Sequence, residues 1–147
     1  MENNVQRQIV KFNRLFKSYD DIYCTAARKF DMPILSLWII YVVRENTICT
    51  QKDLVEQLYH PKQSINSALR SLEKDGYVVL EPLENDHRCK RICLTEKGYI
   101  LAENTADKII DAERLAFSSL ADLEREMFLN LFERLSSELN KEMQNIK

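Results

Sequence analysis

The chain has 147 residues, of which 45% are hydrophobic and 30% are charged, and its formal net charge is -2. This length and composition are typical of one soluble globular domain, and no run approaches the roughly twenty apolar residues that a membrane helix needs. The small net charge gives no general attraction to nucleic acid, so a basic surface has to come from the placement of a few side chains. The N-terminal segment lacks the apolar block of a signal peptide, which predicts a cytoplasmic protein.

Two helices are predicted in the first third of the chain. Apolar residues recur at helical spacing over residues 5–30. Pro33 separates this helix from the next, because the residue before a proline avoids helical backbone angles. Residues 34–45 are apolar on nearly all sides, which predicts a helix buried in the middle of the domain.

The next two predicted helices are short and close together. Thr50, with Asp53 three residues later, is typical of a helix N-terminus, and this helix should end near residue 58. Pro61 suits the beginning of the second helix, which Gly76 should end in a left-handed conformation. Two short helices joined by a few residues predict a helix-turn-helix.

A β-ribbon and two long helices complete the predicted fold. Residues 77–81 and 90–94 have strand-like patterns, and residues 47–49 suggest a small edge strand. Thr95 should cap a helix that runs to about residue 118, and a last helix should span about 122–145. We therefore expect a mainly α fold with a small β-wing, in which a winged helix-turn-helix lobe spans 34–94 within one domain, 1–147.

The flanking helices carry more apolar surface than the lobe can cover. These helices span 5–30 and 96–145. Because large apolar patches are uncommon on soluble monomers, a two-fold homodimer in which the helices bury each other is favoured over an intramolecular bundle.

The residues around the ribbon resemble those of MarR-type transcriptional regulators. Residues 86–98 (DHRCKRICLTEKG) match the family pattern D-x-R-x5-L-T-x-x-G, and residues 72–78 (LEKDGYV) match its junction between recognition helix and wing. The resemblance covers essentially the whole chain. It implies a homodimeric DNA-binding regulator, expected to act as a repressor, whose terminal helices interlock and whose two lobes bind a pseudo-palindromic operator in double-stranded DNA. Where many members have two arginines after the aspartate, this chain has His87-Arg88.

The predicted recognition helix, about 61–75, has a polar face suited to the major groove. Its buried stripe leaves hydrogen-bonding side chains exposed, and Gln, Asn and Arg read base edges while Ser and Lys hold phosphates. The predicted DNA-contacting residues are Pro61, Lys62, Gln63, Ser64, Asn66, Ser67 and Arg70. The alternative is an ordinary solvated helix face.

The predicted wing, residues 81–91, supplies positive charge for the minor groove, where a focused negative potential attracts arginine. Arg88 is expected to enter the groove and Asp86 to hold its guanidinium in a bidentate pair. The remaining predicted contacts of the wing are His87, Lys90 and Arg91. The alternative is a surface hairpin whose salt bridge contributes little.

A reactive cysteine and an effector site are two further expectations. Cys89 lies among basic residues that lower a thiol pKa, so a thiol-based oxidant sensor is one alternative function. Family members bind small aromatic ligands between the dimer helices and the lobe, and an aromatic effector here has candidate contacts in Tyr19, Tyr23, Phe30, Trp38 and Tyr41. For these aromatic residues core packing is the competing interpretation.

Other functional classes find no support in the sequence. The two histidines do not have the spacing of a zinc site, and no cofactor motif or catalytic pattern of an enzyme is present. A winged-helix module that binds a protein partner instead of DNA remains the second alternative.

Overall fold

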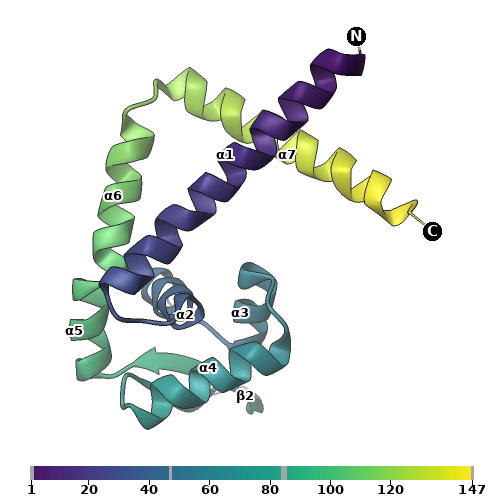
Figure 1. The fold of residues 1–147 in the computed structure, drawn as a ribbon. Coiled ribbons are helices and arrows are strands. Elements are labelled where there is room, and N and C mark those ends of the chain that lie inside the picture. Colours follow the sequence, from purple (N-terminus) through teal and green to yellow (C-terminus); the bar gives the residue numbers. More distant parts are fainter. Residues whose placement is uncertain (1, 47, 84–85, 147) are drawn as a thin grey trace. The chain divides into compact units, whose positions relative to one another are not determined.

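The computed structural model describes the backbone of residues 2–46, 48–83 and 86–146, and the side chains of the same residues except 2, 3 and 86–88. It confirms the mainly α fold with a small antiparallel two-stranded sheet (Figure 1). The elements in chain order are α1 (Glu2–Lys29), α2 (Ile34–Glu45), α3 (Gln51–Leu58), α4 (Lys62–Lys74), β1 (Val78–Leu83), β2 (Asp86–Leu94), α5 (Glu96–Asn104), α6 (Ala106–Ser118) and α7 (Asp122–Gln144).

The chain divides into two compact units, Met1–Lys108 and Ile109–Lys147. The core of the first unit is built around α2, whose apolar side chains are buried on several sides, as the sequence predicted. Helix α4 packs on α2, α3 and β1. The largest fully buried side chains of this core are Leu37, Ile39, Ile40, Leu54, Ile65, Val78 and Cys49.

The helix-turn-helix forms as its local sequence signals predicted. The Thr50 side chain accepts from the Asp53 N–H, and the Asp53 carboxylate accepts from the Thr50 N–H at 2.7 Å, which completes a capping box at the start of α3. Gly76 ends the α4 segment with a φ of 78°, the left-handed region that glycine adopts without strain. Pro61 precedes α4 as its N-cap residue, one position before the helix begins.

The β-ribbon pairs β1 with β2 from Val78 opposite Leu94 to Pro82 opposite Lys90. Its strands are longer than the predicted ones. The predicted edge strand at 47–49 is only a contact with the ribbon: the Ile92 N–H donates to the Cys49 carbonyl at 2.7 Å, and Thr50 forms a single bridge with Arg91. Residue 47 lies outside the described residues.

The two sequence patterns that flank the ribbon meet in space. The Thr95 hydroxyl donates to the Gly76 carbonyl at 2.6 Å and accepts from the Gly98 N–H at 3.0 Å. A Cβ atom on Gly98 would lie 2.0 Å from the Tyr77 carbonyl oxygen, so only glycine fits there. Lys97 donates to the Asp75 carbonyl at 2.7 Å. The start of α5 is thereby fixed against the turn that joins α4 to the ribbon.

The long helix predicted over residues 96–118 is wrong in one respect, because it is interrupted at Thr105. Thr105 has φ -130° and ψ -80°, is 4% exposed, and donates from its hydroxyl to the Leu101 carbonyl at 2.7 Å. Just after the interruption, Asp107 accepts two hydrogen bonds of 2.9 Å from Arg44 at the end of α2. These hydrogen bonds hold the pKa of Asp107 below its ordinary value.

The terminal helices expose apolar side chains at helical spacing, as their sequence indicated. No residue of α7 is buried. In α1 the exposed set includes Val5, Ile9, Phe12, Phe16 and Tyr19, and in α7 it includes Met127, Phe128, Leu131, Phe132, Leu135 and Leu139. Single exposed apolar residues are normal on a protein surface, but continuous stripes of this length indicate an interaction surface.

Candidate functional site

The polar face of α4 is fixed by the residues that the helix buries. Ile65, Leu69 and Leu72 enter the core, which turns positions 63, 67 and 70 toward the solvent. Of the predicted contacts on this helix and at its start, Pro61, Lys62, Gln63, Ser67 and Arg70 are exposed, whereas Ser64 and Asn66 are half-buried. The helix thus offers a row of hydrogen-bonding side chains on one face.

Asn66 has a partner that sequence reasoning missed. The Gln51 side chain, in the first turn of α3, donates from Nε2 to the Asn66 carbonyl oxygen. An amide held in this way has its orientation set, and its NH2 group retains two donors. Gln51 lies fifteen residues from Asn66 along the chain, so no local sequence signal indicated the contact.

The turn between α3 and α4 presents an aromatic side chain that the sequence interpretation also left out. Tyr59 caps α3 with a left-handed backbone, φ 52° and ψ 31°, and is 93% exposed. His60 and Pro61 follow and are exposed as well. A positive φ is uncommon for a residue with a side chain, and here it turns the chain sharply between the two helices.

The structure describes the side chains of part of the predicted wing. Cys89 and Lys90 are exposed on β2, whereas the side chains of Asp86, His87 and Arg88 lie outside the described residues, together with the predicted Asp86–Arg88 pair. Arg91 donates from Nε and Nη2 to the Glu81 carboxylate across the ribbon, at 2.9 and 2.6 Å. These bonds lower the pKa of Glu81, and they neutralise locally a charge that was expected to meet phosphate.

Four of the five aromatic residues suggested for an effector site form one packed row between α1 and α2. The Tyr19 and Tyr23 hydroxyls lie 2.9 Å apart, the Tyr23 and Trp38 ring centroids lie 4.8 Å apart, and those of Trp38 and Tyr41 lie 5.5 Å apart. Phe30 instead borders a separate hollow along α1 with a volume of about 390 Å³. Tyr19 is 53% exposed and the other three residues of the row are half-buried, so the row leaves both interpretations open and the effector contact stays a prediction.

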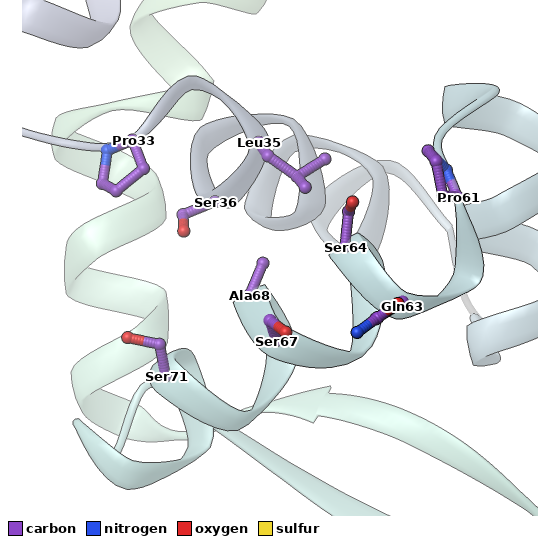
Figure 2. Close-up of a pocket in the computed structure, with 9 residues that line it drawn as sticks. All are labelled: Pro33, Leu35, Ser36, Pro61, Gln63, Ser64, Ser67, Ala68 and Ser71. Atoms are coloured by element: carbon purple, nitrogen blue, oxygen red, sulfur yellow. The ribbon is translucent and has the colours of Figure 1, made fainter.

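A larger hollow, the α2–α4 hollow, lies between the start of α2 and α4 and has a volume of about 700 Å³ (Figure 2). Helix α4 and the residue before it contribute Pro61, Ser64, Ser67 and Ser71, while Pro33 and Ser36 come from the start of α2. Figure 2 shows the Ser36 and Ser64 side chains directed toward the space between the two helices. The sequence interpretation placed Ser64 and Ser67 on the reading face but did not include Ser36.

The thiols differ in their surroundings. Burial raises the pKa of Cys49 to about 12 and, together with a hydrogen bond to Glu81, raises the pKa of Cys93. Among the described residues no group of three or more His, Cys, Asp or Glu side chains is arranged to hold a metal ion. None of the described helices is long and apolar enough to cross a membrane.

Comparisons with known proteins agree with this geometry. A family model described as MarR family matches residues 30–88. An uncharacterized HTH-type transcriptional regulator of Bacillus cereus is 30% identical over 92 residues, which are 63% of this chain and 57% of that protein. The chain therefore spans little more than half the length of this curated relative.

Two solved structures show the shared fold. NMB1585, a MarR family regulator from Neisseria meningitidis, has a TM-score of 0.82 at 18% identity, covering 95% of this chain and 99% of that one. MepR of S. aureus, in a structure of its DNA complex, has a TM-score of 0.67 at 24% identity, covering 86% of this chain and 96% of that one.

Proposed function

Because the chain is a MarR-type winged helix-turn-helix protein, we propose that it is a DNA-binding transcriptional regulator, a repressor that binds a pseudo-palindromic operator and has no enzymatic activity. The exposed polar row of α4 carries this proposal. It consists of Gln63, Ser67 and Arg70 on a helix held rigidly by its buried stripe. Side chains of these types, on the second helix of a helix-turn-helix, reach base edges in the major groove.

The wing is the second part of the proposed interface. Lys90 is exposed on β2, and the interlocked contacts of Thr95, Gly76 and Gly98 fix the base of the ribbon against the end of α4. A ribbon held at a fixed place beside the reading helix supports simultaneous contact with the major groove and the adjacent minor groove. We assign Asp86, His87 and Arg88 to the minor-groove contact.

We further propose that the regulator acts as a homodimer. The exposed apolar stripes of α1 and α7 are the observation that supports it. A two-fold axis would bury both stripes and present two copies of α4 to one operator. In this arrangement residues 5–30 and 96–145 form the dimer and residues 34–94 form the DNA-binding lobe. An aromatic effector near Trp38 would act by favouring one spacing of the lobes.

The proposal is tested with Arg70→Ala and Arg88→Ala. A duplex selected in vitro for binding to the wild-type protein serves as the probe, and its affinity is measured over a range of salt concentrations. Loss of Arg70 should weaken binding by about 1–3 kcal/mol, roughly 5- to 150-fold, if the arginine contacts a base. Arg88→Ala should weaken binding and lower the salt slope by about one unit for each phosphate that the arginine neutralises.

Arg114→Ala is the matched control, since Arg114 is an exposed arginine of α6 paired with Asp111. It should leave both the affinity and the salt slope unchanged. The proposal is wrong if no duplex can be selected, or if Arg70→Ala and Arg88→Ala bind like the control.

Cys89 is exposed in the predicted wing, which favours a second candidate function, that of a regulator switched by oxidation of this thiol. Peroxide treatment should then weaken DNA binding of the wild type and not of Cys89→Ser. Equal sensitivity of the two proteins, or no sensitivity in either, would remove this candidate.

A further inference from the structure

The α2–α4 hollow is bordered by two helix N-termini of the same construction (Figure 2). Pro33 stands before α2 with φ -59° and ψ 135°, and Pro61 stands before α4 with φ -55° and ψ 138°. The third residue after each proline is a serine, Ser36 in α2 and Ser64 in α4, and both serines border the hollow. Neither helix has a side-chain hydrogen bond that caps its N-terminus.

The first turns of α2 and α4 also lack the acidic residues that four other helices of the chain have. Each of α3, α5, α6 and α7 has an acidic residue in its first turn, whereas α2 and α4 have none. No described residue bordering the hollow is acidic. The first N–H groups of a helix have no acceptor within the helix and carry partial positive charge, so an uncapped start without a carboxylate suits an oxyanion.

Ser36 points independently to a ligand in the hollow. The residue is only 7% exposed, and the described residues supply its hydroxyl with no hydrogen-bond partner. In the described part of the chain, every fully buried polar side-chain atom has a hydrogen-bond partner. The unpartnered Ser36 hydroxyl is therefore accessible, and Figure 2 shows its side chain directed into the hollow. Ser36 is thus more than nine-tenths buried, and its hydroxyl can donate to a ligand that enters the hollow.

We infer that the α2–α4 hollow seats a backbone phosphate of the operator, with the Ser36 hydroxyl and the first N–H groups of α2 as donors. The inference rests on the proposed DNA-binding function. With α4 in the major groove, the strand that borders the groove runs beside this helix, and backbone contacts of this kind come from hydroxyls and helix N-termini. The contact would position α4 without reading sequence.

The test compares Pro33→Asp with Pro33→Asn, which differ in charge but not in size. Both side chains can accept from the first N–H groups of α2, and only aspartate repels phosphate. On a selected duplex of about 30 base pairs, three helical turns, the Asp variant should bind at least about tenfold more weakly than the Asn variant. Its salt slope should be lower by about 0.9 for each lobe. In thermal unfolding the Asp variant should be at least as stable as the Asn variant, since a carboxylate favours a helix N-terminus.

Ser36→Ala tests the proposed phosphate contact without a change of charge. It should weaken DNA binding about threefold to tenfold, as expected for one hydrogen bond, and should not lower the thermal midpoint. Equal DNA affinities for the Asp and Asn variants, or wild-type affinity for Ser36→Ala, would overturn the phosphate seat while leaving the regulator function intact. Failure of the wild type to bind any duplex would instead overturn the function on which the inference rests.

Discussion

Glu81 faces Arg91 across the ribbon, and this pair reduces the positive charge that the ribbon offers. The Arg91 Nη2 atom lies 2.6 Å from Glu81 Oε2, and both side chains are nearly half exposed, at 47% and 45%. An exposed pair of this kind contributes little to stability. Its larger effect is electrostatic, since a carboxylate next to the arginine opposes the approach of phosphate.

We predict that Glu81→Gln strengthens DNA binding. The substitution keeps the size of the side chain and removes the negative charge beside Arg91 that opposes the approach of a phosphate. Affinity should rise several-fold, and the salt slope should increase by about one unit for each lobe. Glu126→Gln, an identical change of charge on α7, is the control. If both variants bind equally more tightly, the effect belongs to the net charge and not to the pair.

At the level of elements, the joint between α4, the ribbon and α5 depends on two glycines with different requirements. Gly76 needs its left-handed backbone but has open space around its Cα atom. Gly98 has an ordinary helical role but no space, because the Tyr77 carbonyl lies where its Cβ would be. At Gly76 the positive φ disfavours other residues, whereas at Gly98 the Tyr77 carbonyl leaves no space for a side chain.

The two alanine variants should therefore differ in stability. Gly76→Ala should lose about 1–2 kcal/mol through left-handed strain. Gly98→Ala must move α5 away from Tyr77, and it should lose about 3 kcal/mol or more, at the upper end for overpacked sites. Urea unfolding monitored by circular dichroism measures both. A smaller loss for Gly98→Ala than for Gly76→Ala would contradict the close packing of Gly98 against the Tyr77 carbonyl.

The Arg44–Asp107 pair joins the end of α2 to the start of α6, and its contribution should depend on pH. Because the pKa of Asp107 is lowered in the folded protein, its stabilisation is complete above the ordinary value of 3.8 and is lost as pH falls through the lowered pKa. Asp107→Asn should cost about 0.5–1 kcal/mol at pH 7. The difference from the wild type should shrink as the pH falls below 3.8 and disappear below the lowered pKa of Asp107.

Asp111→Asn is the matched control for this pair. Asp111 pairs with Arg114 within one helix, and both side chains are largely exposed, at 68% and 70%. Its removal should cost less at pH 7 than the removal of Asp107. An equal cost for both variants, measured by urea unfolding at pH 7, would show that the two-bond geometry of Asp107 adds nothing.

The sequence predicted those elements whose signals are local. Thr50 with Asp53, Gly76 and Thr95 each mark an end through hydrogen bonds or angles that involve near neighbours, and all three ends were found. The break at Thr105 was missed because its neighbours keep apolar residues at helical spacing on both sides. Gln51 and Ser36 were missed because their importance depends on a second helix that meets them only after folding.

At the scale of the whole molecule, the exposed apolar stripe of α7 predicts a homodimer, and a charged substitution within the stripe tests it. Phe132→Glu places a charge within the stripe and should shift the protein toward monomer in sedimentation velocity, with loss of DNA affinity. Asn130→Glu adds the same charge on the opposite side of α7 and should leave the assembly intact. If Phe132→Glu sediments like Asn130→Glu, the stripe is not the dimer interface.

The uncapped starts of α2 and α4 have a consequence for attempts to improve this protein. Helix capping is among the simplest routes to higher stability, and these two positions are where an added aspartate has most to gain. If phosphate uses the same N–H groups, a library selected only for heat resistance would accumulate proteins that fold well and no longer bind their operator. Thermal stability and DNA binding would then have to be selected together.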